Sequence, residues 1–240
     1  MVDKESLCSC LALYDLDVGQ IDYKGLFYEL LAWIHELGYT PVRASVDGEG
    51  INHHTTKTFK YVKKLMEERD FKGLTGFWLG VTPPDHKDDS FDSFISAGIS
   101  TDIRANNLSL YVNNAIMDPG WEYVEELATR FLPFLPCRYG IGYQWKQSWS
   151  PSFYAVGILG GLQPIGTPEA DYARDMISRW FHNYGDPKYW RTGMLRDVYP
   201  LNFLSQAHLA NQVEGMPFDQ WVASDLARGT LNPLTDSMWS

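Results

Sequence analysis

Short apolar segments of strand character alternate with amphipathic helical patterns along this chain, and the alternation constrains the fold more than any other feature. The run Cys8–Tyr14 is typical of a buried strand. Apolar residues from Leu26 to Leu37 recur at helical spacing and predict a helix over Ile21–Leu37. No linker or low-complexity segment divides the chain. We therefore expect one mixed α+β domain over residues 1–240, with helices packed on antiparallel sheet and room for two similar sub-layers.

The same patterns predict the remaining elements. Arg138–Trp145 is expected to pair with Phe153–Leu159 as neighbouring strands, and Asn106-Asn107 indicates a hairpin between two alternating segments. Asp118 followed by proline indicates the start of a helix. Further strands are expected at Pro41–Val46, Gly73–Thr82, Ile99–Arg104, Leu108–Val112, Val198–Leu204 and Ser237–Ser240, and further helices after Thr55 or Thr56, after Thr167-Pro168 and over Phe218–Asp225.

The chain is acidic, with 30 acidic and 20 basic residues and a net charge of -10. Residues 1–120 hold 18 acidic and 11 basic residues, a net of -7, which leaves -3 for the second half. This balance argues against nucleic acid or an anionic membrane as the direct ligand, and it favours a basic partner. A solvated surface that keeps the protein soluble is the alternative.

Cysteine content and the amino terminus bear on the compartment. Cys8, Cys10 and Cys137 fit a reducing compartment better than a disulfide framework. Cys8 and Cys10 share one face of the first expected strand, as small core residues. The amino terminus lacks a cationic region, and no apolar run approaches membrane-spanning length. We therefore expect a cytoplasmic protein with no membrane contact.

No complete catalytic motif is present, so we expect a protein that is not an enzyme and needs no cofactor. The Gly-x-Gly triplet at 140–142 lacks the third glycine of a dinucleotide fingerprint. The best metal-ligand candidates are Asp47, Glu49, His53 and His54. Adjacent histidines in an extended segment point to opposite sides, and the spacings of zinc motifs are absent. A polar loop is the favoured interpretation, and a metal-dependent enzyme stays the alternative.

Four carboxylates within eight residues, at Asp85, Asp88, Asp89 and Asp92, form the densest acidic cluster of the chain. Such a cluster could imitate phosphates and meet the lysines and arginines that line a nucleic-acid cleft. A solvated turn, screened by salt, is the alternative. We take the four aspartates as candidate partner-binding residues.

Two further pairs are candidates for partner binding. Glu125 and Glu126 could extend the outward face of an amphipathic helix, although a solvated helix face explains them as well. Trp145 and Trp149 bracket a short polar segment near an expected hairpin tip. An exposed tryptophan there would suit an interface anchor, so we expect one of the two to be exposed.

Three segments carry a family resemblance: Arg138-Tyr139-Gly140, the run Arg196–Leu209 and the ending Gly229–Trp239. They resemble bacterial toxin-immunity proteins, in particular the immunity protein 52 family linked to type VI secretion effectors. The matched stretches lie in the C-terminal half, and no family interface residue is carried over.

The resemblance implies a cytoplasmic antidote that binds and blocks a cognate toxin. Toxins paired with this family often look like nucleases of restriction-endonuclease fold, so the implied partner is a basic, DNA-cleaving effector. Besides the metal-dependent enzyme, a structural adaptor of secretion machinery is the other alternative.

Overall fold

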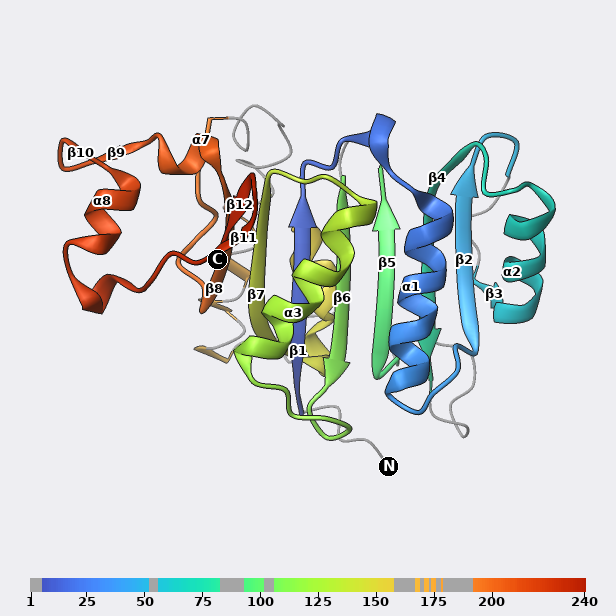
Figure 1. The fold of residues 1–240 in the computed structure, drawn as a ribbon. Helices are drawn as coiled ribbons and strands as arrows, with labels where there is room; N and C mark the ends of the chain where they lie inside the picture. Colours follow the sequence, from blue (N-terminus) through green and yellow to red (C-terminus); the bar gives the residue numbers. More distant parts are fainter. Residues whose placement is uncertain are drawn as a thin grey trace.

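The computed structural model describes residues 6–51, 56–82, 93–101, 106–157 and 192–240, with 167–168, 171–172, 174–175 and 178. The described residues build a ten-stranded antiparallel sheet in the order β11-β12-β8-β7-β1-β6-β5-β4-β2-β3 (Figure 1). Its strands are β1 (Leu7–Tyr14), β2 (Arg43–Gly48), β3 (Lys57–Thr58), β4 (Leu74–Val81), β5 (Ile95–Ser100), β6 (Asn107–Asn113), β7 (Tyr139–Lys146), β8 (Leu201–Ser205), β11 (Pro233–Thr235) and β12 (Met238–Trp239). A separate small hairpin pairs β9 (Gln212–Val213) with β10 (Met216–Pro217).

The helices of the described residues lie around this sheet. They are α1 (Tyr23–Glu36), α2 (Phe59–Glu68), α3 (Trp121–Phe131), α4 (Pro151–Val156), α7 (Gln206–Leu209) and α8 (Phe218–Ala223), with short 3-10 turns at η1 (Val18–Gln20), η3 (Leu132–Phe134), η4 (Gln147–Trp149) and η5 (Leu226–Arg228). Helices α1 and α3 cover one face of the sheet, whereas α4 lies on the opposite face (Figure 1). The prediction of a single mixed α+β domain with an antiparallel sheet is confirmed.

Strand β1 contributes buried side chains to both faces of the sheet. Its alternate residues point to opposite sides of the sheet. Leu11 and Leu13 join the cluster under α1 and α3, whereas Cys10 and Tyr14 join a second cluster on the side of α4. The predicted burial of Cys8 and Cys10 on one strand face is confirmed, because both thiols are free and buried in the second cluster.

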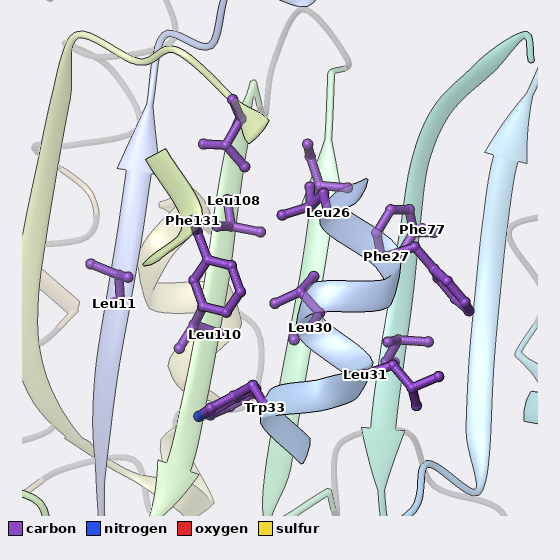
Figure 2. Close-up of a cluster of buried hydrophobic side chains, with 14 of the residues drawn as sticks. Leu11, Leu26, Phe27, Leu30, Leu31, Trp33, Phe77, Leu108, Leu110 and Phe131 are labelled. Atoms are coloured by element: carbon purple, nitrogen blue, oxygen red, sulfur yellow. The ribbon is translucent and has the colours of Figure 1, made fainter. Parts of the chain in front are cut away.

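The face under α1 and α3 is a hydrocarbon core. Figure 2 shows Leu26, Leu30 and Leu31 projecting from α1 towards the sheet, and Phe131 of α3 lying near Leu110 of β6. Complete burial of each such side chain contributes about 1.5–3 kcal/mol to folding. The predicted apolar stripe of the first helix is therefore confirmed as the main contact between α1 and the sheet.

The opposite face is built from aromatic rings around a buried arginine. Arg196 donates from Nη1 to the Tyr14 hydroxyl at 2.9 Å and to the Ala155 carbonyl at 3.1 Å. Its Nη2 donates to the Tyr154 carbonyl at 2.7 Å, and the guanidinium lies 4.4 Å from the centroid of the Tyr154 ring. Burial raises the pKa of Tyr14 to about 12 against the opposing effect of the arginine charge, so the hydroxyl stays protonated. Arg196 thus ties α4 to the sheet.

One predicted strand is wrong. Phe153–Leu159 was expected to pair with β7, but Pro151–Val156 forms α4. A short apolar run fits a buried helix as well as a strand, and Pro151 occupies the first helical turn, where proline is favoured. Strand β7 pairs with β1 on one side and with β8 on the other.

Two predicted helix starts are also wrong. Helix α3 begins at Trp121 with Gly120 as its N-cap, while the Asp118 carboxylate accepts a hydrogen bond from Asn114 Nδ2 at 2.9 Å. The side chain that looked like a helix cap therefore closes the preceding turn. Helix α2 begins at Phe59 with Thr58 as its N-cap, because Lys57 and Thr58 pair with β2 and form the short strand β3.

The predicted hairpin is confirmed with shifted bounds. Strands β5 and β6 pair antiparallel from Ile95 opposite Val112 to Ser100 opposite Asn107. Asn107 lies inside the second strand, and the first strand begins four residues before its expected start at Ile99.

Candidate partner-binding surfaces

Helices α1 and α3 are joined by an ion-pair network at their exposed side. Arg130 Nε donates to Glu29 at 2.5 Å, and the two Nη atoms of Arg130 donate to Glu36 at 2.5 and 2.8 Å. Hydrogen bonds from Arg130 lower the pKa of Glu36 and keep it ionised. Trp33 Nε1 also donates to the Tyr123 hydroxyl at 2.8 Å, so the two helices are held side by side.

The predicted Glu125 and Glu126 lie on this same side. Glu126 is exposed, whereas Glu125 is half-buried and accepts a hydrogen bond from the Ser240 hydroxyl. We call this side the carboxylate face; its charged residues are Glu29, Glu36, Glu122, Glu125, Glu126 and Arg130, with a net charge of -4. Arg130 fixes two of the five carboxylates and Ser240 a third, so these three are held in place before any partner binds.

The predicted tryptophan pair lies on the other side of the sheet. Trp145 is half-buried in β7, stacks on Tyr154 with ring centroids 3.9 Å apart, and donates from Nε1 to the Trp149 carbonyl at 3.2 Å. Trp149 is only 8% exposed, and Lys146 Nζ lies 4.9 Å above its ring. The expected hairpin tip is absent here, since β7 leads into η4 and α4. Neither tryptophan is exposed as expected, although Trp145 keeps partial access to solvent.

The structure therefore places the two predicted pairs of partner-binding residues that it describes on opposite faces of the sheet. Glu125 and Glu126 lie over the hydrocarbon core, and Trp145 and Trp149 belong to the aromatic cluster on the opposite face. One flat interface cannot include both pairs. The acidic cluster formed by Asp85, Asp88, Asp89 and Asp92 lies outside the described residues, and its role stays a prediction.

The predicted metal ligands are only partly described. Asp47 lies in β2, and Glu49 follows in the turn, where its carbonyl accepts from Arg69 Nη1 at 2.8 Å. His53 and His54 lie outside the described residues. Within the described part of the chain, no group of three or more histidine, cysteine, aspartate or glutamate side chains is placed to hold a metal ion. None of the helices in the described residues has the length and apolarity needed to cross a membrane.

One surface feature was missed by the sequence reasoning. A cavity of about 260 Å³ lies on the face opposite α1, where it is lined by residues of β2, β4, β5 and β6 and by the start of α4. A signal for it exists in the sequence, because small residues recur at every second position around a single tryptophan. These positions are Gly76, Trp78 and Gly80 in β4 and Ser96, Gly98 and Ser100 in β5.

Comparison with known proteins gives a likeness of fold. No family model matches the chain, and no curated protein matches it. The chain is similar in structure to the Pseudomonas aeruginosa T6SS protein PA0821, with a TM-score of 0.53 and 13% sequence identity. The similarity covers 98% of this chain and 64% of the other, so this chain spans somewhat less than two thirds of that protein. At this identity the comparison establishes a shared fold, and membership of the immunity protein 52 family stays a hypothesis.

Proposed function

We propose that this chain is an immunity protein of a type VI secretion system, which binds a cognate secreted toxin and neutralises it by stoichiometric inhibition. The observation that carries the proposal is the fold shared with a T6SS protein along 98% of the chain. The three segments that resemble toxin-immunity proteins add the more specific role. The proposed activity is binding in the cytoplasm, with no reaction catalysed and no cofactor.

The proposed partner is a basic nuclease effector of restriction-endonuclease type. The net charge of -10 gives long-range attraction to such a protein and repels nucleic acid. The carboxylate face supports this proposal most directly among the described residues, because three of its five carboxylates are held by polar contacts on two adjacent helices. Ordered carboxylates lose little side-chain entropy on binding, which favours affinity.

The contact residues in this proposal are those of the carboxylate face, Glu125 and Glu126 among them. The cluster from Asp85 to Asp92 is proposed as a second acidic contact. Trp145 is proposed as an aromatic contact on the opposite face, for a partner that reaches around the sheet edge formed by the C-terminal strands.

Co-expression with the protein encoded by the adjacent reading frame tests the proposal. We expect that protein to be toxic alone, to be harmless with this chain, and to co-purify with it in a fixed ratio. Failure of this chain to restore growth would contradict the immunity role. Incorporation into a large assembly without any restoration of growth would support the structural adaptor instead.

A further inference from the structure

The cavity opposite α1 has a floor made of three strands in register. Ser45 of β2 pairs with Trp78 of β4, which in turn pairs with Gly98 of β5. In the next row Gly80 pairs with Ser96. Since alternate residues share one face of a strand, all of these side chains lie on the side away from the hydrocarbon core. The cavity of about 260 Å³ is completed by Thr56, Tyr111, Ser150, Ser152 and Phe153.

Trp78 lies against two glycines of the sheet. A Cβ atom at Gly80 would come within 2.2 Å of the Trp78 ring, and one at Gly98 within 3.1 Å. The indole Nε1 donates to Ser96 Oγ at 2.7 Å, which fixes the ring orientation. Among the described residues no other aromatic ring or cation stacks on the indole, and Trp78 is half-buried. The sheet therefore holds one side of the indole and leaves the other side to the cavity.

The walls of the cavity carry hydroxyl groups that have no partner among the described residues. Within the described part of the chain, the hydroxyls of Ser45, Ser150 and Ser152 bond no other protein group. Ser150 has a left-handed backbone with φ of 52° and does not cap α4 with its side chain. Ser96 Oγ accepts from Trp78 and keeps its own proton for donation. Each hydroxyl can both donate and accept a hydrogen bond.

The charge of the lining selects the class of ligand. Among the described residues, no lysine, arginine, aspartate or glutamate lines the cavity. A charged ligand would lose hydration there and find no countercharge on the described lining residues, which is costly. An uncharged ligand with several hydroxyl groups and an apolar face meets both the free hydroxyls and the indole. Drug-sized ligands occupy pockets of about 300–1,000 Å³, so the smaller volume here suits a single ring.

We propose that this cavity binds one pyranose ring of a carbohydrate. The C–H face of the sugar stacks on Trp78, and its hydroxyl groups exchange hydrogen bonds with Ser45, Ser96 and Ser150. This site lies on the side of the sheet opposite the carboxylate face and does not depend on the proposed immunity function.

The test uses NMR of the full chain with methyl glycosides of glucose, galactose, mannose and N-acetylglucosamine. The indole resonance of Trp78, assigned by its loss in Trp78→Phe, should shift saturably with at least one glycoside. Saturation-transfer difference spectra should show the C–H protons of that sugar closest to the protein. The Trp78→Leu variant should weaken binding about tenfold and Ser96→Ala about fivefold.

Trp145→Phe is the matched control, because Trp145 is another half-buried tryptophan of the same sheet face that does not line the cavity. It should bind the sugar as the wild type does. The proposal is overturned if no glycoside gives a saturable shift while the protein is folded. It is also overturned if N-acetyl-arginine amide shifts the Trp78 resonance and the sugars do not, or if Trp145→Phe weakens binding as much as Trp78→Leu.

Discussion

The two faces of the sheet differ in chemistry although the same strands build both. In β4, Phe77 and Leu79 enter the hydrocarbon core, whereas Trp78 and Gly80 face the other side. The helix-covered face is sealed by aliphatic and phenyl groups, and the opposite face carries tyrosines, serines and a buried arginine. The first arrangement stabilises the fold without a specific polar partner. The second leaves hydroxyl and aromatic groups that can recognise a ligand.

Truncation of the hydrocarbon core should have the largest effect on stability. Phe131→Ala should lower the free energy of unfolding by about 3–5 kcal/mol, because it leaves a cavity between α3 and the sheet. Ser109→Ala, on the opposite face of β6, should change it by less than about 0.5 kcal/mol. Urea unfolding measures both values. Equal losses in the two variants would contradict the claim that the hydrocarbon core stabilises the fold more than the opposite face of the sheet does.

Removal of the buried arginine should be the next largest effect. Arg196→Met removes one donor from each of the Tyr154 and Ala155 carbonyls, which keep the Gly157 amide and the Tyr14 hydroxyl, and should cost about 3 kcal/mol. Arg228→Met is the matched control, because Arg228 lies 4.2 Å from the centroid of the Trp221 ring at the surface. That variant should cost less than about 1 kcal/mol. A similar loss in both would show that ring stacking, and not burial, gives Arg196 its effect.

The aromatic face should also make the protein sensitive to acid. Burial lowers the pKa of His208 to about 4, below the ordinary value of 6.5, so the unfolded chain binds the proton more tightly. Stability is complete above pH 6.5 and falls as the pH drops towards 4, by about 2 kcal/mol at pH 5. Unfolding measured between pH 7 and pH 4.5 checks this. His208→Asn should be less stable at pH 7, and its free energy of unfolding should fall less steeply as the pH drops. An unchanged slope would contradict the assignment of the acid sensitivity to His208.

The exposed carboxylates should matter least to stability. Glu122→Gln and Glu126→Gln change exposed side chains of α3 and should each alter the unfolding free energy by less than about 0.5 kcal/mol. Thermal unfolding at low and high salt provides the check. A loss above 1 kcal/mol would mean that the carboxylate face stabilises the fold. A change in partner binding by these variants would then not separate lost contacts from lost stability.

The sequence predicts the parts of the fold that local patterns decide. The stripe from Leu26 to Ile34 identifies α1 because one helix face packs on the sheet with regular spacing. Phe153–Leu159 misleads because its apolar run carries no period that separates a helix from a strand. Trp78 and the two glycines against its ring lie on paired strands, and the cavity depends on their register, which a single sequence does not reveal.

The candidate partner-binding sites also combine residues that local patterns predict with residues that only tertiary packing brings together. Glu125 and Glu126 were found from the amphipathic pattern of α3, but their neighbours Glu29 and Glu36 come from α1, about ninety residues earlier. Only the packing of the two helices brings these four carboxylates together. The separation of Trp145 and Trp149 from this face likewise depends on which side of the sheet the Trp145 side chain of β7 and the following turn η4 occupy.

The proposed binding of a basic partner by the carboxylate face can be measured through the association rate of the complex. The double variant Glu122→Gln, Glu126→Gln should bind the adjacent reading-frame product about tenfold more slowly than the wild type at low salt, and the difference should shrink at high salt. Asp219→Asn with Asp236→Asn removes the same charge from the C-terminal region and should slow association far less. Equal association rates for the wild type and the α3 variant, or equal slowing by both double variants, would exclude the carboxylate face as the binding surface.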